Sequence, residues 1–319
     1  MKIFDAAATR AALPFERLVP ALQSLFASGC EVPLRHVHEV PVPGERGFTS
    51  LIMPAWIPGR YYGIKTINIA PGNAQRGLPG LHASYLLCDG ATGVPLAVLD
   101  GDAITHYRTA AASALAARWL ARDDARHLLV VGAGQVARLL PQAYRSVRPI
   151  GQVSVWARSA AKARALADEW RQQGLPARAA TDLRAACGEA DIVSCATLAT
   201  EPLVHGEWLR PGSHLDLIGS FTPAMREADD ACFAGAALYV DTGEALTKSG
   251  ELLGPMSRGV FQPQDVRGTL AALARGEAAG RASPQERTVF KSVGTALEDL
   301  AAAILVYESA SAQTAPTPA

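Results

Sequence analysis

A glycine-containing turn at residues 132–137 has the residue types and spacing that a bound dinucleotide needs. In the sequence G-A-G-Q-V-A, Gly132 permits a tight turn, Gly134 lets the backbone approach a pyrophosphate, and the small Ala137 permits close helix packing. An apolar run, 128–131, comes before the turn, and a helix whose N-terminus attracts anions is expected after it. The turn predicts a dinucleotide site that includes Gly132, Gly134, Gln135 and Val136. A plain strand-to-helix turn is the alternative.

The segment after the next apolar run, 152–156, indicates which dinucleotide is bound. An NAD site usually places a carboxylate there, where it binds the ribose 2′-OH. This chain has Ala157, Arg158 and Ser159 instead, with Lys162 one turn further on. Because a guanidinium binds a 2′-phosphate by charge-assisted hydrogen bonds, NADPH is the expected cofactor and NADH the second choice. The alternative is that Arg158 is a solvated loop residue.

Two cations fall on faces that are expected to be buried. Strand alternation places Lys65 on the side of Ile67 and Ile69, and helical spacing places Arg108 on the stripe of Ala112 and Leu115. A lone buried cation is costly, so each needs an anionic partner. Two interpretations stay open: a structural salt bridge, or a pair of cations that binds a substrate carboxylate. Arg35 is a third candidate, although alternation does not decide which way it faces.

The sequence predicts neither a metal site nor a hydrolase active site. His36 and His38 share a strand face, but no third ligand lies at a usable spacing, so no metal site is predicted. The chain also lacks the G-x-S-x-G, H-E-x-x-H and Walker patterns.

The elements that must position these residues divide the chain into three zones. Short extended runs separated by Pro-Gly and Asp-Gly turns predict a mainly antiparallel sheet up to about residue 110, with strands at 34–40, 48–53, 64–69, 83–88 and 94–99. Alternating strands and helices then predict a parallel sheet, with strands at 127–131, 152–156, 191–195, 214–218 and 237–241 and helices at 136–146 and 161–172. A last helix is expected to begin at Ser283-Pro284 and to carry Val289, Val293, Ala296, Leu300 and Ile304 on one face. It is expected to pack on the first zone.

Composition limits the class of partner. The 319 residues are 49% hydrophobic and 19% charged, and 30 Lys+Arg balance 30 Asp+Glu. Zero net charge argues against nucleic acid or an anionic membrane as partner and favours a small ligand or another subunit. Five widely spaced cysteines and the lack of a signal-peptide core predict a cytoplasmic protein with reduced thiols.

Several stretches together resemble the ornithine cyclodeaminase and mu-crystallin family: D-G-D-A-I-T-H-Y-R-T-A-A at 100–111, the Gly132 turn, T-L-A-T-E-P at 197–202, W-L-R-P-G-S-H at 208–214 and T-V-F-K-S-V-G at 288–294. The resemblance implies an α/β fold in which a Rossmann-type parallel-sheet domain, 113–295, is inserted into a mainly antiparallel α+β domain for substrate binding and dimerisation, 1–112 and 296–319. The tail, 309–319, is expected to be disordered because it is rich in Ser, Ala, Thr and Pro.

The resemblance also implies roles for individual residues. Arg35, Lys65 and Arg108 match the basic residues that bind the substrate carboxylate in the family, and Lys65 and Arg108 are the expected catalytic residues. The positions expected along the nicotinamide and phosphate groups are Thr109, Leu198, Gly219 and Gly294.

One departure from the family pattern concerns the type of reaction. Ornithine cyclodeaminases carry an aspartate shortly after the glycine of the fifth strand, whereas this chain has Phe221 in the segment G-S-F-T-P-A-M-R-E. A phenyl ring cannot accept a proton, and the segment resembles the Δ1-pyrroline-2-carboxylate reductases of the family. The expected activity is therefore NADPH-dependent reduction of a cyclic ketimine, Δ1-pyrroline-2-carboxylate or Δ1-piperideine-2-carboxylate, to L-proline or L-pipecolate, with Phe221 as an apolar wall beside the ring. The alternatives are ornithine cyclodeaminase and a non-enzymatic NADPH-dependent binding protein like mu-crystallin. A homodimer is expected.

Overall fold

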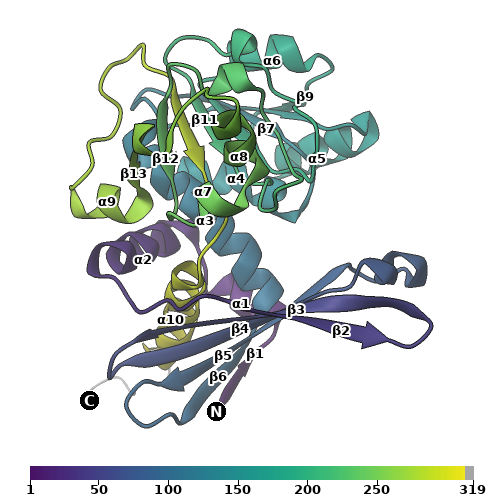
Figure 1. The fold of residues 1–319 in the computed structure, drawn as a ribbon, viewed down its shortest axis with the longest axis vertical. Coiled ribbons are helices and arrows are strands. Elements are labelled where there is room, and N and C mark those ends of the chain that lie inside the picture. Colours follow the sequence, from purple (N-terminus) through teal and green to yellow (C-terminus); the bar gives the residue numbers. More distant parts are fainter. Residues whose placement is uncertain (313–319) are drawn as a thin grey trace. The chain divides into compact units, whose positions relative to one another are not determined.

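The computed structural model describes residues 1–312, which form two compact units (Figure 1). The first unit consists of Met1–Arg108 and the C-terminal segment from Thr295, and the second consists of Thr109–Gly294. The α/β class and the two kinds of sheet expected from the sequence are confirmed.

The first unit is built on a six-stranded sheet in the order β1-β6-β5-β4-β3-β2. Only β1 and β6 pair in parallel, and the other neighbours are antiparallel. The strands are β1 (Lys2–Phe4), β2 (His36–Val42), β3 (Glu45–Ile57), β4 (Tyr61–Ile69), β5 (Leu81–Asp89) and β6 (Pro95–Asp100), and a short 3-10 helix, η1 (Pro71–Arg76), follows β4.

The sequence predicted no helix ahead of the first expected strand at 34–40, but two helices, α1 (Ala6–Ala11) and α2 (Phe15–Ser28), come before the antiparallel strands. The buried positions of α2 recur at helical spacing, at Phe15, Leu18, Val19, Leu22, Leu25 and Phe26. Gly29, at φ +77°, ends the helix. The sequence signal for α2 was therefore present.

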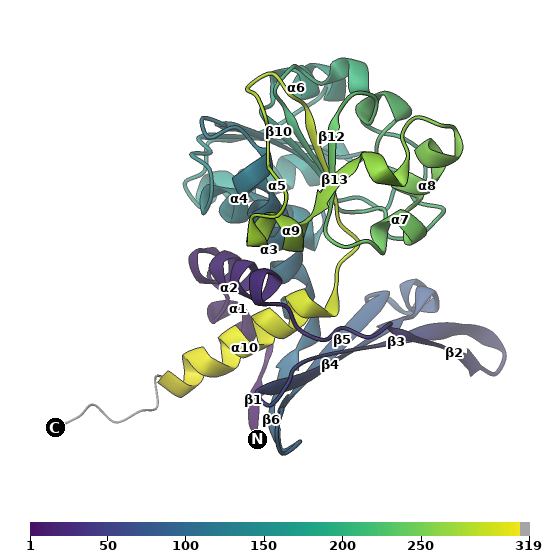
Figure 2. The ribbon, with the colours of Figure 1, turned by 60° about the vertical axis from the view of Figure 1, so that its left-hand side comes forward.

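The C-terminal helix begins later than the sequence suggested. Residues Thr288–Lys291 form β14, a fully buried strand, and helix α10 covers Ala296–Ala312. A strand that is buried on both faces has no alternating pattern, so Val289 and Phe290 can be mistaken for part of a helical stripe. As expected, α10 packs on the first zone, where it lies against α2, β3, β4 and β5 (Figure 2). Residues 309–312 belong to α10 and are not disordered, and the rest of the expected tail lies outside the described residues.

The second unit contains an eight-stranded parallel sheet in the order β13-β12-β14-β11-β10-β7-β8-β9. Its strands are β7 (His127–Val131), β8 (Gln152–Trp156), β9 (Ala177–Ala179), β10 (Ile192–Cys195), β11 (His214–Leu217), β12 (Ala237–Val240), β13 (Val266–Thr269) and β14. The direction of strand progression reverses beside β7, which has β8 on one side and β10 on the other. Such a switch point is where doubly wound sheets bind nucleotides.

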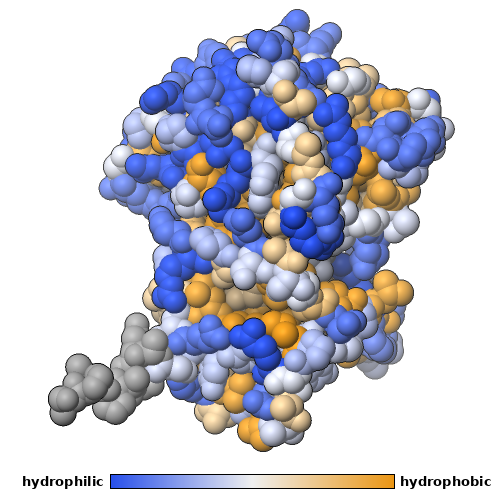
Figure 3. Space-filling model, turned by 90° about the vertical axis from the view of Figure 1, so that its left-hand side faces the viewer, coloured by the Kyte–Doolittle hydropathy of each residue, from blue (hydrophilic) through white to orange (hydrophobic). Residues whose placement is uncertain are grey.

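Helices connect these strands. They are α4 (Gln135–Arg145), α5 (Ala160–Gln172), α6 (Leu183–Glu189), α7 (Ala245–Lys248), α8 (Gly250–Ser257) and α9 (Leu270–Arg275), with 3-10 helices η2 (Gly206–Trp208), η3 (Asp230–Cys232) and η4 (Pro263–Asp265). Helix α3 (Gly101–Leu120) carries the chain from the first unit into the second. Hydrophilic side chains cover most of the surface of the second unit that Figure 3 shows. Among residues 1–312, no helix combines the length and the apolar character needed to cross a bilayer.

Candidate active site

Lys65 is fully buried within the first unit. It lies on β4, where Gly63, Lys65 and Ile67 all point to the covered face of the sheet. Its Nζ lies 2.5 Å from Oδ2 of Asp299 and 3.4 Å from Oγ1 of Thr105. The acidic partner that a buried ammonium requires is thus supplied by helix α10.

Arg108 is 7% exposed and has the same acidic partner. Its Nε donates to Oδ1 of Asp299 at 2.9 Å, and its Nη1 donates to Oε2 of Glu298 at 2.5 Å. Asp299 therefore bridges the two cations, with one oxygen facing each. We call Lys65, Arg108, Glu298 and Asp299 the buried charge cluster. Both carboxylates are fully buried. With two cations and two carboxylates, the cluster contains two positive and two negative formal charges.

Burial lowers the pKa of Lys65 to about 8, and the positive charge of Arg108 acts in the same direction. The carboxylate of Asp299 opposes this shift. Lys65 is therefore a cation at neutral pH, and it loses its proton in mildly alkaline solution. A buried ammonium of this kind can bind a carboxylate and can also exchange a proton.

Tyr85 lies directly across from Lys65, on β5. Its ring extends over Gly63, where an added Cβ would lie 2.0 Å from the phenol oxygen, so only glycine leaves room for the ring. Burial raises the pKa of Tyr85 well above its usual value, and the charge of Asp299 adds to the effect. Within residues 1–312 the hydroxyl has no hydrogen-bond partner.

Sequence reasoning missed Tyr85, Glu298 and Asp299. The two acids interrupt an otherwise apolar helical stretch, A-L-E-D-L-A-A-A-I-L-V, and this interruption was a usable signal.

Arg35 lies one residue before β2 and is partly exposed. The first pair of β2 is His36 with Ile52, so Arg35 falls beside Met53. Met53 pairs with Lys65, and directly opposed residues point to the same face of a sheet. The register thus favours the same sheet face for Arg35 and Lys65.

In the second unit, the turn at 132–137 has the geometry that its glycines predict. Gly132 has φ +124°, and its N–H donates to the carbonyl of Trp156 at 2.8 Å. A Cβ on Gly132 would lie 2.5 Å from the carbonyl oxygen of Ala196, whereas a Cβ on Gly134 would meet open space. Gly134 is the N-cap of α4 and supplies no side-chain cap, and Ala137 is fully buried. An exposed, uncapped helix N-terminus fits a pyrophosphate.

The other predicted positions of this turn are the first two residues of α4. Gln135 is exposed and Val136 is half-buried.

The segment 157–159 follows β8, whose last residue, Trp156, pairs with the last residue of β7. It therefore lies at the same edge of the sheet as the Gly132 turn. Arg158 and Ser159 are exposed, and Ala157 is half-buried. Ser159 is the N-cap of α5, where its hydroxyl accepts from the backbone of Lys162 at 3.4 Å. Arg158 is accessible to a ligand phosphate.

Three of the four remaining predicted cofactor positions follow strands of the parallel sheet. Leu198 comes after β10, Gly219 after β11 and Gly294 after β14. Phe221, the predicted wall beside the substrate ring, also follows β11 and is 44% exposed, while Leu198 is 68% exposed. Both are unusually accessible for large apolar side chains, as expected for residues that contact a ligand. Thr109, the fourth position, is half-buried on α3.

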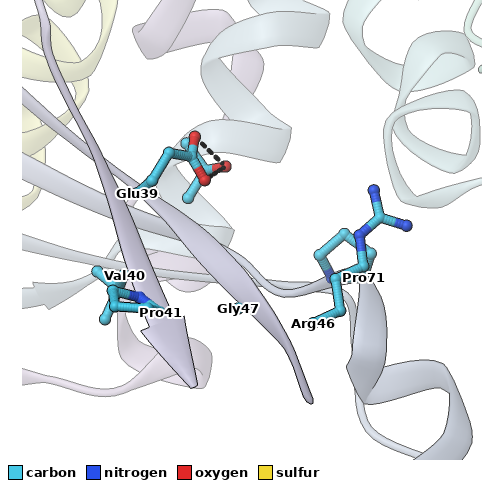
Figure 4. A pocket seen from close by; sticks show the side chains of 7 residues that line it. Glu39, Val40, Pro41, Arg46, Gly47 and Pro71 are labelled. Carbon is cyan, nitrogen blue, oxygen red and sulfur yellow. Dashed lines mark hydrogen bonds between the residues drawn. The ribbon is translucent and has the colours of Figure 1, made fainter. Parts of the chain in front are cut away.

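A separate hollow lies beside the hairpin of β2 and β3. It is lined by Glu39, Val40, Pro41, Arg46, Gly47, Thr49 and Pro71. Figure 4 shows Glu39 on the opposite side of the hollow from Arg46, and Glu39 accepts a hydrogen bond from Thr49 at 2.9 Å. None of the predicted site residues lines it. Within residues 1–312, no group of three His, Cys, Asp or Glu side chains is placed to hold a metal ion.

An antiparallel-sheet unit with a buried charge cluster and a Rossmann-type unit with a glycine turn beside its switch point are the architecture of a nicotinamide-dependent class of protein. Residues 26–314 match the ornithine cyclodeaminase/mu-crystallin family, and the chain belongs to this family. The resemblance seen in the sequence is therefore confirmed.

Individual members of the family are similar to this chain over most of their length. The chain is 45% identical to Δ1-pyrroline-2-carboxylate reductase of Paracoccus denitrificans over 274 residues, which cover 85% of this chain and 86% of that protein. It resembles the structure of Thermococcus litoralis Δ1-pyrroline-2-carboxylate reductase in complex with NADH and L-proline, with a TM-score of 0.91, 32% identity and full coverage of both chains. An archaeal alanine dehydrogenase dimer with bound NAD gives a TM-score of 0.90 at 29% identity, over 99% of this chain and 98% of that one.

Proposed function

We propose that this chain is an NAD(P)H-dependent ketimine reductase that converts Δ1-pyrroline-2-carboxylate, or its six-membered homologue, to L-proline or L-pipecolate. The observation that carries the proposal is the buried charge cluster, in which Lys65 and Arg108 share Asp299. The relatives named Δ1-pyrroline-2-carboxylate reductase support an oxidoreductase that acts on a cyclic C=N bond.

Lys65 and Arg108 bind the substrate carboxylate, and Arg35 adds a third positive charge from the same sheet face. Glu298 and Asp299 hold the two buried cations in place and balance their charge, so the cluster is neutral without substrate. A cyclic iminium carboxylate also has no net charge and adds none to the cluster. Because the imine can bind already protonated, the main task of these residues is to orient the ring.

The residues of the second unit fit a nicotinamide cofactor. Gly132, Gly134 and the N-terminus of α4 hold the pyrophosphate, and Arg158 with Lys162 binds a 2′-phosphate, which favours NADPH over NADH. When bound, the reduced nicotinamide supplies the hydride for the C=N carbon. Leu198, Gly219, Gly294 and Thr109 line the cofactor, and Phe221 forms the apolar wall beside the substrate ring.

The surroundings of Phe221 favour reduction over cyclodeamination. In the family, cyclisation of ornithine uses an aspartate near the side-chain amine, and the acid within the segment 219–227 of this chain is Glu227. Glu227 is fully buried and accepts hydrogen bonds from the backbone N–H groups of Thr197 and Gly219, both at 2.7 Å. It is therefore not available to replace the aspartate that Phe221 displaces.

The uncovered face of the antiparallel sheet supports a homodimer. The register places Pro54, Ile64, Leu86 and Val98 in one row across four strands, on the face opposite Lys65. All four are partly exposed. Such an apolar row is better explained by a second copy of the chain than by solvent.

The decisive experiment measures NADPH and NADH oxidation at 340 nm with Δ1-pyrroline-2-carboxylate, beside an assay of ornithine conversion to proline without added reductant. Rapid NADPH oxidation and no ornithine turnover are expected. Ornithine turnover without net cofactor oxidation would establish the cyclodeaminase instead. Tight NADPH binding with neither reaction would favour a non-enzymatic binding protein.

A further inference from the structure

Two fully buried carboxylates of the second unit tie together the ends of neighbouring parallel strands. Oε1 of Glu227 accepts from the N–H and the hydroxyl of Thr197, at 2.7 and 2.8 Å, and its Oε2 accepts from the N–H of Gly219 at 2.7 Å. Thr197 lies two residues after β10, and Gly219 lies two residues after β11. A single side chain thus bridges the loops of two adjacent strands.

Asp241 bridges the ends of the next two strands of the sheet, β12 and β14, in the same way. It follows β12, and its Oδ2 accepts from the N–H groups of Val293 and Gly294, both at 2.7 Å, just beyond β14. Because the sheet order is β12-β14-β11-β10, the two carboxylates bridge four consecutive strand ends.

Lys291 occupies the position between the two bridges. It is the last residue of β14, is fully buried, and donates from Nζ to the carbonyl of Leu217 at 3.0 Å. The charges of Glu227 and Asp241 both act on it. Glu251 fixes the bridging residue itself, because its two oxygens accept from the N–H groups of Glu227 and Ala228, at 2.7 and 2.9 Å.

The two bridged loops approach each other so closely at Gly219 that no residue with a side chain fits there. A Cβ on Gly219 would lie 1.8 Å from the carbonyl oxygen of Thr197 and 2.6 Å from Oε1 of Glu227. The glycine is thus required by the neighbouring loop. The bridge fixes where the N–H and C=O groups of this edge point.

The position of the bridged loops in the sheet indicates which half of a dinucleotide they would contact, namely the nicotinamide half. In a doubly wound sheet the cofactor lies across the switch point at the carboxyl ends of the strands. Here the pyrophosphate turn follows β7 and the segment with Arg158 follows β8, so the adenosine half belongs on that side. The nicotinamide half then belongs over β10, β11 and β14, on the other side of β7.

We infer that Glu227 and Asp241 are positioning residues for the nicotinamide half of the cofactor. They act through the loops of Thr197, Gly219 and Gly294. The inference rests on the nicotinamide site proposed above, but it does not depend on the identity of the imine.

Glu227→Gln is the main test. An amide has one oxygen and one N–H2 group, so in either orientation an N–H2 faces a backbone N–H of Thr197 or Gly219 and leaves it unpaired. Binding of NADPH and of 2′-phospho-ADP-ribose, which lacks the nicotinamide, is measured by calorimetry on the full chain. NADPH binding is expected to weaken about tenfold, while binding of the fragment changes less than about twofold.

Asp191→Asn is the matched control. Asp191 is a buried carboxylate at the opposite edge of the same sheet, where it accepts from the N–H groups of Arg126 and His127, both at 2.9 Å. Its replacement is expected to lower the thermal midpoint without a preference between the two ligands. Asp241→Asn serves as a second variant should Glu227→Gln fail to fold, and it is expected to show the same selective loss of NADPH binding.

Equal weakening of NADPH and the fragment in Glu227→Gln, or a selective loss in Asp191→Asn, would overturn the inference and leave these carboxylates with a structural role alone. A protein that shows the selective loss yet reduces no cyclic imine would support the inference while contradicting the proposed reaction.

Discussion

The ammonium of Lys65 lies 2.5 Å from Oδ2 of Asp299, and both side chains are fully buried. One residue comes from a strand near the start of the chain and the other from its last helix. The second oxygen of Asp299 accepts from Arg108 at 2.9 Å. Of the two interpretations of these cations, the geometry shows the salt bridge. The substrate site remains our proposal, in which the acids that neutralise the cations also orient them.

Asp299→Asn is expected to destabilise the chain by about 3–5 kcal/mol, since it leaves two buried cations with only Glu298 as a carboxylate partner. The free energy of unfolding in urea measures the effect. Glu16→Gln, at an exposed position on α2, is the control and should change stability by less than about 0.5 kcal/mol. Equal losses in the two variants would contradict a special role for Asp299.

Arg108→Ala is expected to reduce kcat/KM for the cyclic imine by about 2–4 kcal/mol in transition-state free energy, the range for losing a buried charge-assisted contact. Steady-state kinetics at saturating NADPH provides the measurement. Arg118→Ala removes an exposed guanidinium from the same helix and should leave kcat/KM unchanged. A near-normal kcat/KM in Arg108→Ala would remove Arg108 from the site.

The pH dependence of substrate binding follows from Lys65. Burial lowers its pKa from 10.5 to about 8, so the ammonium is present below about pH 8 and is lost above it. The kcat/KM for the imine is therefore expected to fall above this pH, approaching tenfold per pH unit. Lys65→Arg keeps its charge throughout this range and should shift the fall to higher pH. An unchanged alkaline limb in this variant would assign the limb to another group.

Much of the site could be predicted from the sequence because its cations break a pattern. Lys65 and Arg108 are charged residues at positions where strand and helix periodicity require apolar ones, and both proved buried. Asp299 also breaks an apolar pattern, but its pairing with these cations could not be predicted, since it is distant in sequence and only the packing of α10 against β4 brings it near.

Strand β14 shows where prediction from the sequence fails. Its residues Val289 and Phe290 are both buried because β12 and β11 flank the strand and both faces of the sheet are covered. Without alternation, local sequence cannot distinguish such a strand from the start of a helix. The Gly132 turn was predictable because its glycine spacing lies within six consecutive residues, and the positive φ of Gly132 is a local constraint that glycine meets.

Arg158→Ala is expected to raise the KM for NADPH by at least about tenfold and to leave the KM for NADH within about twofold, because only NADPH carries the 2′-phosphate. The two KM values are measured with the same imine at a fixed concentration. Arg164→Ala, an exposed arginine on α5, is the matched control and should alter neither value. Equal increases for the two cofactors would remove Arg158 from the 2′-phosphate role.

Ile64→Asp is expected to convert a homodimer to monomers. Ile64 stands in the apolar row between Pro54 and Leu86, on the face of β4 opposite Lys65, so a carboxylate there would be buried without a partner at the interface. Sedimentation velocity of the wild type and the variant at matched concentrations checks the mass. Ala160→Asp places the same charge at the exposed start of α5 and should leave the mass unchanged. A wild-type chain that sediments as a monomer, or an Ile64→Asp variant that remains dimeric, would show that this face does not form the dimer.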